Sequence, residues 1–403
     1  MRFHYVAVLA SLTSVAVSQS SQKSLKEALS GNKNLTRLQS LLEDYSDFYA
    51  KFEWTEDVTV LAPSNAAFEK LPYSSLKSVF EGEDGDTIRG ILNYHVLNHT
   101  ITADSFTNAP QFAATKLDNA TFSNVTGGQA VLLVKQGEKD RIQVSGLGSR
   151  STLTTADIPF RGGLVHIIDN FLITPQVFLK EATQFNLTAV GGAITKAKLG
   201  SYIENTRDLT VFAPRNDAFQ AIGSRLKDMT VEQLGGLLRY HVVNGSVNYS
   251  PDLKNGTILQ SLQGANLTIR AGGASLYVNS AQIVQQDLLL ANGVMHVIDN
   301  VLDYNATAAQ PNPEIPSQPA IIPGSSVTYL PFSSDLPTST SSSPITPSVS
   351  GDAAATSDDF ASSTSSSFAA ATSISEDGAT ANAMSGESLL AAFFGAAIAM
   401  VAI

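Results

Sequence analysis

The chain has 403 residues, a formal net charge of −11 at pH 7 and no cysteine. This charge excludes nucleic acid as the expected partner, because phosphate binding requires clustered Lys and Arg. The lack of cysteine excludes a disulfide-held scaffold, so the domains must be large enough to be stabilised by apolar burial alone.

The N-terminal end has the features of a secretory signal peptide. Arg2 supplies a positive start, an apolar run follows over residues 6–17, and Ala16-Val17-Ser18 has the small residues of a cleavage site. The apolar run is too short to span a bilayer. We therefore assign residues 1–18 to a signal peptide and expect the mature protein outside the cell.

Three blocks of sequence occur twice in the same order. "TVLAPSNAAF" at 59–68 returns as "TVFAPRNDAF" at 210–219, "LNYHVL" at 92–97 returns as "LRYHVV" at 238–243, and "GLVHIIDNFL" at 163–172 returns as "GVMHVIDNVL" at 293–302. Such self-similarity predicts two copies of one module.

The pattern within one copy predicts an α+β fold. Apolar residues recur with helical spacing over 24–52, and a short β-branched run at 58–62 predicts a buried strand that Pro63 ends. Asn65 and Asn216 are expected to be helix N-caps. Further helices are predicted in 74–80, 86–97 and 224–243, and strands in 129–134, 141–145, 265–270, 274–278 and around His166.

Asn-x-Ser/Thr sequons are dense in this chain, and with a signal peptide they predict N-glycosylation at surface positions. The sequon at Asn248 is set aside because Pro251 follows its Ser250. The expected sites are Asn34, Asn98, Asn119, Asn124, Asn186, Asn244, Asn255, Asn266 and Asn305.

The C-terminal part changes in composition. Residues 305–378 are rich in Pro, Ser and Thr, which predicts a disordered, O-glycosylated stalk. Residues 379–403 end in an apolar tail with no positive residue after it, so they match a glycosylphosphatidylinositol attachment signal better than a membrane-spanning helix. Gly378 is the expected lipid-bearing residue and Asn382 the alternative.

The three blocks resemble those of the fasciclin (FAS1) domain family, over residues 23–174 and 176–304. The layout is similar to that of two-domain, lipid-anchored fungal members. The resemblance implies that each copy is a wedge of two β-sheets flanked by a helical cluster. It also implies adhesion or matrix proteins without catalytic residues, cofactor or metal.

In animal members the region around the Tyr-His pair is implicated in integrin binding. Carried over, this points to Tyr94, His95, Tyr240 and His241 as a partner region with the ligand left open. The residues themselves favour another interpretation, because these histidines, with His166 and His296, lie among Val, Ile and Leu without metal-ligand spacing. We expect buried histidines hydrogen-bonded within the fold.

These features predict a glycosylated, lipid-anchored cell-surface protein that mediates cell adhesion. Its expected partners are cell-surface or matrix proteins and glycans, with membrane contact through the lipid only. The expected location is the outer leaflet of the plasma membrane or, after transfer, the cell wall. The alternative is a cell-wall structural or remodelling factor that binds wall polysaccharide. An enzyme acting on wall carbohydrate is disfavoured, because the visible acidic pairs, such as Glu56-Asp57, are adjacent and solvated.

Overall fold

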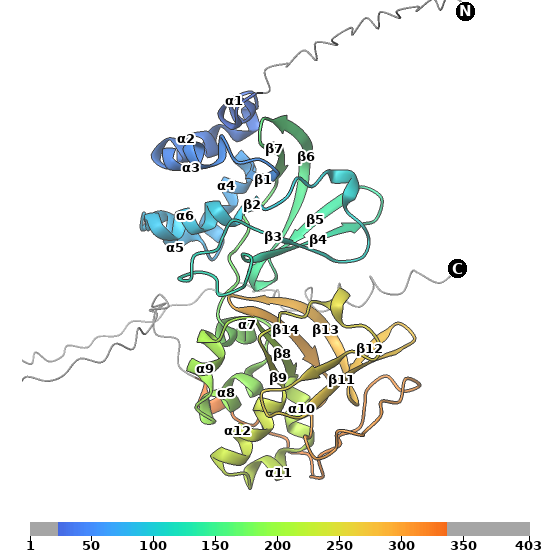
Figure 1. Cartoon of the computed structure of the whole chain (residues 1–403). Helices are drawn as coiled ribbons and strands as arrows, with labels where there is room; N and C mark the ends of the chain where they lie inside the picture. The colour runs from blue at the N-terminus through green and yellow to red at the C-terminus, as the bar shows by residue number, and fades with distance from the viewer. Residues whose placement is uncertain (1–22, 337–403) are drawn as a thin grey trace, which may run out of the picture.

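The computed structural model describes residues 23–336, which form two domains stacked end to end (Figure 1). In both domains the helices lie on one side and the strands on the other. The predicted signal peptide, both candidate lipid-bearing residues, Gly378 and Asn382, and the predicted attachment signal over residues 379–403 lie outside the described residues. Within the described part, no helix is both long and apolar enough to span a membrane.

The first domain begins with helices and ends with strands. Its elements are α1 Leu25–Ser30, η1 Lys33–Leu35, α2 Thr36–Asp44, α3 Ser46–Phe52, β1 Val58–Pro63, α4 Asn65–Lys70, η2 Leu71–Tyr73, α5 Lys77–Glu81, α6 Gly85–Tyr94, β2 Val96–Leu97, η3 Ala103–Ser105, β3 Gln111–Ala114, β4 Ala130–Gln136, β5 Asp140–Val144, η4 Gly146–Gly148, β6 Arg150–Phe160 and β7 Gly163–Ile168.

The second domain repeats this order. Its elements are α7 Phe178–Gln184, α8 Thr188–Lys196, α9 Gly200–Asn205, β8 Leu209–Pro214, α10 Asn216–Ala221, α11 Gly223–Lys227, α12 Val231–Tyr240, β9 Val242–Asn244, η5 Ser250–Asp252, β10 Ile258–Gln260, β11 Asn266–Gly272, β12 Ser275–Val278, β13 Ala281–Leu290 and β14 Gly293–Ile298; η6 Ser333–Asp335 follows the domain.

The seven strands of each domain are hydrogen-bonded side by side in one continuous order. This order is β2-β1-β7-β6-β5-β4-β3 in the first domain and β9-β8-β14-β13-β12-β11-β10 in the second. The long strand β6 pairs with β5 through residues 150–152 and with β7 through residues 153–160. It is therefore shared by two sub-sheets. This arrangement confirms the expected α+β architecture, in which two sheets are flanked by helices.

Strand β1 is buried on both faces, which explains why its sequence is apolar apart from Thr59. Val60 packs with the helical cluster, whereas Leu61 packs with residues of the second sub-sheet such as Val131. β1 runs parallel to β7 and antiparallel to β2. The first and third recurring blocks thus contain two adjacent parallel strands of the domain.

The prediction that Asn65 caps a helix is wrong. The N-cap of α4 is Ser64, whose hydroxyl accepts from the N–H of Ala67 at 3.3 Å. Asn65 instead accepts from the N–H of Arg37 at 3.0 Å and donates to the carbonyl of Lys33 at 3.1 Å, so it fastens the start of α2 to the corner after β1.

The prediction that Asn216 is an N-cap is wrong in the same way, because that position belongs to Arg215. Asn216 accepts from the N–H of Ala189 at 3.0 Å and donates to the carbonyl of Asn186 at 2.7 Å, as Asn65 does in the first domain. The Asn of the recurring decamer therefore joins two helices in both domains.

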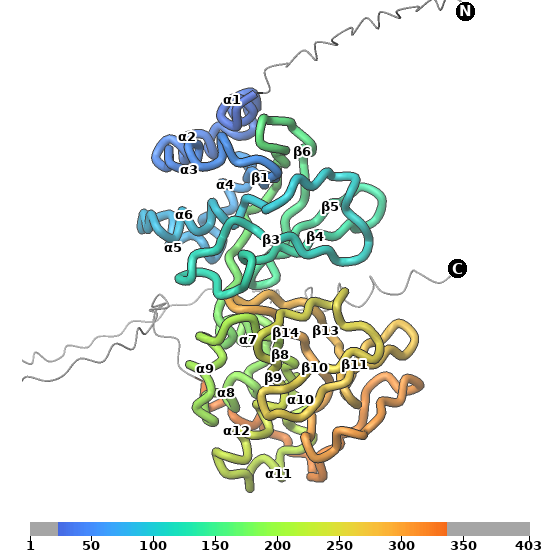
Figure 2. Tube along the Cα trace, in the orientation of Figure 1, coloured from blue at the N-terminus to red at the C-terminus, as the bar shows by residue number. Residues whose placement is uncertain are grey.

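Residues 305–336, here called the strap, do not behave as the start of a disordered stalk. The strap runs along the second domain as the orange segment of Figure 2. Ile322 is buried in the core of that domain, and the N–H of Val327 donates to the carbonyl of Gln220 at 3.0 Å. The predicted boundary at residue 305 is therefore too early; residues 337–378 of the predicted stalk lie outside the described part.

Glycines of the second domain leave space in which the strap packs. A Cβ atom on Gly192 would overlap the carbonyl oxygen of Phe332, and one on Gly223 would overlap the side chain of Val327. Lys196 adds an ion pair with Asp335 at 3.9 Å. These contacts make the strap an integral part of the second domain.

Candidate functional site

The Tyr-His pair of the first domain lies at the end of α6, where the chain turns into β2. Both side chains are buried, Tyr94 at 0% and His95 at 2% exposure. The hydroxyl of Tyr94 donates to the carbonyl of Ala130 at 2.8 Å. His95 Nδ1 lies 2.8 Å from the carbonyl of Ile91, and Nε2 accepts from the N–H of Leu172 at 3.0 Å. This pairing requires the proton on Nδ1.

The second domain repeats this geometry. His241 Nδ1 lies 2.9 Å from the carbonyl of Leu237, and Nε2 accepts from the N–H of Leu302 at 2.9 Å. Tyr240 donates to the carbonyl of Asn266 at 2.9 Å. Burial lowers the pKa of His95 and of His241 to about 4, so both rings are neutral near pH 7.

These contacts confirm the expectation of buried, hydrogen-bonded histidines. The side chains carried over as a partner region, Tyr94, His95, Tyr240 and His241, are all buried and occupied within their own domains. A partner that meets this region would touch its exposed neighbours and not these four side chains.

The remaining two recurring histidines hold β-bulges. Asp157 has a φ of 56° where β6 shifts register, and its N–H donates to His166 Nδ1 at 3.0 Å. His166 Nε2 donates to the carbonyl of Ile101 at 2.7 Å. The second domain repeats these contacts: the N–H of Asp287 donates to His296 Nδ1, and His296 Nε2 donates to the carbonyl of Asn248. Burial lowers the pKa of both histidines, which fits neutral rings in structural roles.

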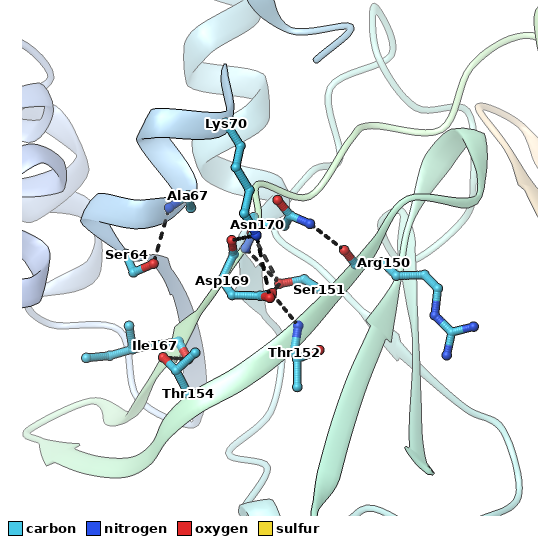
Figure 3. Close-up of polar contacts among 10 residues, drawn as sticks. All are labelled: Ser64, Ala67, Lys70, Arg150, Ser151, Thr152, Thr154, Ile167, Asp169 and Asn170. Carbon is cyan, nitrogen blue, oxygen red and sulfur yellow. Dashed lines mark hydrogen bonds and ion pairs between the residues drawn. The ribbon is translucent and has the colours of Figure 1, made fainter. Parts of the chain in front are cut away.

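The Asp-Asn pair after β7 closes a corner of the first domain (Figure 3). Asp169 accepts from the N–H of Thr152 at 2.7 Å, and Asn170 donates to the carbonyl of Arg150 at 2.9 Å. Lys70 donates to the carbonyl of Asp169 at 2.8 Å. The contacts tie β6, β7 and α4 together.

In the second domain the same pair binds the strap. Asp299 accepts from the N–H of Gln282 at 2.8 Å and from the N–H of Gln318 at 2.8 Å. Asn300 donates to the carbonyls of Gln318 at 2.8 Å and Pro319 at 2.9 Å. The recurring Asp-Asn pair therefore binds strand backbone in both domains, and in the second domain it also binds the backbone of the strap.

The two domains meet at an interface that sequence reasoning missed, here called the seam. From the first domain, Asn124 donates to the carbonyl of Asn205 at 3.0 Å, and the N–H of Thr126 donates to Asp208 at 2.7 Å. The buried Gln129 donates to the carbonyl of Leu290 at 3.0 Å. The seam joins non-equivalent surfaces of the two copies, so no repeated motif marks it.

A second contact of the seam involves a buried carboxyl group. Glu181 in α7 accepts from the N–H of Leu147 in the first domain at 2.9 Å and from the N–H of Gln176 in the linker at 3.0 Å. Burial raises the pKa of Glu181 to about 7. The carboxyl group of Glu181 therefore has its pKa close to the pH of a neutral solution.

A groove of about 480 Å³ opens beside the seam. Both domains contribute to its walls, and the aromatic pair Phe112 and Tyr249 stacks within it at a centroid distance of 3.9 Å and an interplanar angle of 11°. Composition and motif spacing carry no signal for either residue.

Most predicted sequons lie on the surface. Asn98 and Asn124 are half-buried, and Asn124 takes part in the seam. The exposed ones are Asn34, Asn119, Asn186, Asn244, Asn255, Asn266 and Asn305. Among residues 23–336 no group of three His, Asp or Glu side chains is arranged to hold a metal ion.

Comparison with known proteins agrees with this geometry. The Fasciclin domain family matches residues 33–174 and 185–304. A fasciclin-like arabinogalactan protein of Arthroderma benhamiae is 33% identical over 338 residues, covering 82% of this chain and 78% of the relative. Another from Cercospora beticola is 29% identical over 309 residues, covering 75% and 81%.

Among solved structures, a FAS1 domain pair from the insect cell adhesion molecule fasciclin I aligns over 69% of this chain and 99% of its own, with 19% identity and a TM-score of 0.34. The matched family covers both duplicated modules. The chain therefore belongs to the fasciclin family and carries two tandem FAS1 domains.

Proposed function

We propose that this protein acts outside the cell as a lipid-anchored surface glycoprotein that mediates adhesion through its two FAS1 domains. The observation that carries the proposal is that the recurring polar side chains bind groups within their own domain. The histidines, tyrosines and asparagines of the signature blocks are engaged in hydrogen bonds inside the fold. The blocks therefore build a scaffold, and function is left to the exposed surface.

Chain features outside the domains support the same role. The signal peptide over residues 1–18 and the lipid signal over residues 379–403 would display the domains on the outer leaflet. Many weak contacts by many anchored copies would add up through multivalency. Such a protein works by contact and not by turnover, so we assign it no catalytic residue.

The seam favours presentation of the two domains as one body. Its hydrogen bonds include side chains that are buried between the domains, such as Gln129 and Glu181. A fixed pair presents its two exposed surfaces at a constant spacing, which reduces the conformational entropy lost when both engage one partner.

The alternative is a cell-wall structural or remodelling factor that binds wall polysaccharide. The dense sequons and the half-polar groove beside the seam favour it. Fractionation separates the two roles. Release by a phosphoinositide-specific phospholipase supports the lipid-anchored surface protein, whereas release by glucanase alone supports the wall factor.

The decisive experiment is a gene deletion scored for attachment to solid surfaces and to other cells. The strain is rescued with the full chain and, as the control for anchorage, with a chain lacking residues 388–403. We expect attachment to fall in the deletion strain and to return only with the full chain. Normal attachment in a deletion strain without related genes would end the adhesion proposal.

A further inference from the structure

Tyr249 has no counterpart in the first domain, although its backbone position does. The carbonyl of the preceding residue, Asn248, accepts from His296, just as the carbonyl of Ile101 accepts from His166. The residue after Ile101 is Thr102, which is exposed. The fold of a single domain therefore does not require an aromatic side chain at this position.

Tyr249 reaches across the seam and stacks on Phe112 of the first domain. Its hydroxyl oxygen is buried, and no hydrogen-bond partner for it occurs among the described residues. Burial, with smaller contributions from Asp287 and Asp208, raises the pKa of Tyr249 above its usual value. The hydroxyl therefore stays protonated and can donate to a ligand. An unpaired buried hydroxyl is costly, so a bound acceptor would remove a penalty.

The groove beside Tyr249 has a mixed lining. Thr126, Asp208 and Ser246 supply polar groups to the lining, and Ala114 and Val247 supply apolar groups. The carboxylate of Asp208 disfavours an anionic ligand. A volume of about 480 Å³ lies within the range of small-ligand sites, roughly 300–1,000 Å³.

We propose that this groove binds a neutral saccharide, with the Tyr249 hydroxyl donating to a sugar oxygen. A sugar offers hydroxyl and ether oxygens on its edges and C–H groups on its faces, which matches the lining. The inference rests on the proposed role outside the cell, where such sugars are present. It is tested by binding in solution, so its failure is distinct from a failure of cell attachment.

The same chemistry is available from two sources. One is free polysaccharide outside the cell. The other is the protein's own sugar at Asn244, an exposed sequon next to Gly245 in the groove lining. The first domain carries the equivalent sequon at Asn98, which is half-buried and donates to the carbonyl of Gly127.

The test uses the secreted protein in two forms, untreated and with its N-glycans trimmed enzymatically. Each form is titrated with laminaritriose, chitotriose and mannotriose, and binding is followed by calorimetry and saturation-transfer NMR. The variant Tyr249→Phe removes only the unpaired hydroxyl and keeps the stack on Phe112. The matched control is Tyr73→Phe, because Tyr73 is 92% exposed and lies far along the chain from the groove.

We expect Tyr249→Phe to melt at or above the wild-type temperature and to bind the sugar about tenfold more weakly, the effect of losing one hydrogen bond. Ala114→Leu should block the groove, while Tyr73→Phe should bind as wild type. If only trimmed protein and Asn244→Gln bind, the resident sugar is the chain's own. The proposal is overturned if neither form binds any of the three sugars, or if Tyr249→Phe and Ala114→Leu bind like wild type.

Discussion

His95 Nε2 accepts a hydrogen bond from the backbone N–H of Leu172 at 3.0 Å, and this contact fastens the end of α6 to the chain that leaves β7. His241 and Leu302 make the same contact in the second domain at 2.9 Å. Two elements distant in sequence are thus joined by one neutral imidazole in each copy. The Tyr-His pair belongs to the framework of the FAS1 domain.

The first prediction concerns these imidazoles. His95→Ala and His241→Ala remove the acceptor of the buried N–H of Leu172 and of Leu302, so each should lower the free energy of unfolding by about 1–3 kcal/mol. Chemical denaturation of the purified protein measures this loss. A variant that unfolds like wild type but no longer supports attachment would instead assign the histidine to the partner surface.

The second prediction follows from the lowered histidine pKa values. An unfolded histidine titrates near 6.5, whereas burial lowers the pKa of His95 and His241 to about 4. The unfolded chain therefore binds more protons between these values. The stability that these two histidines contribute should be complete above pH 6.5 and fall as the pH drops toward 4. Melting temperatures across this window measure the effect, and a flat profile in this window would contradict it.

The third prediction has the opposite sign and concerns Glu181. Burial raises the pKa of Glu181 from 4.5 to about 7, so the folded protein holds this proton more tightly than the unfolded chain does. The contribution is present below pH 4.5 and lost as the pH rises through 7. This effect opposes that of the histidines in the same pH window, so Glu181→Gln should steepen the fall in stability as the pH drops from 7 to 4.5. An unchanged profile in this variant would contradict a raised pKa for Glu181.

The fourth prediction concerns the sequon at Asn124. The side-chain amide of Asn124 donates to the carbonyl of Asn205 across the seam. The hydroxyl of Thr126, the third residue of the sequon, donates to the carboxylate of Asp208. A sugar on Asn124 would have to enter the seam. We expect mass spectrometry of glycopeptides to find Asn124 largely unmodified and the neighbouring exposed Asn119 modified. High occupancy at Asn124 in a protein that keeps its domains together would contradict this prediction.

The fifth prediction uses the glycines beneath the strap. Ala in place of Gly inside a helix normally stabilises it by about 1 kcal/mol. At Gly192 the added methyl would meet the carbonyl of Phe332, so Gly192→Ala should destabilise the protein by about 1–3 kcal/mol. Gly200→Ala is the matched control, because a methyl group at that position would meet no neighbouring group within 4 Å. Equal stability of the two variants would show that the strap is not held there.

Local pattern predicted the elements that bury apolar surface. The run at Val58 had to be apolar because both faces of β1 are covered, and the alternation around His166 marked its parallel neighbour β7. The pattern gave the wrong role for Asn65, because asparagine is suited both to capping a helix and to hydrogen-bonding the backbone of a neighbouring helix. The choice between them depends on contacts with Lys33, far along the chain.

The seam and the strap could not be predicted for a different reason. Tyr249 meets Phe112 between surfaces that are not equivalent in the two copies, so the repeat carries no trace of the contact. The composition of residues 305–336 indicates disorder, and only the shape of the second domain, with space left by Gly192 and Gly223, gives this segment a place to pack.

The position of the strap has a mechanical consequence. Any pull on the chain from residue 337 onward enters the second domain at Leu336, which packs beside Gly191 of α8. Load would peel the strap from its end toward Asn300 before it reaches the hydrogen-bonded strands. The strap would thus detach before the strands separate, and its loss would protect both sheets of the second domain from the load.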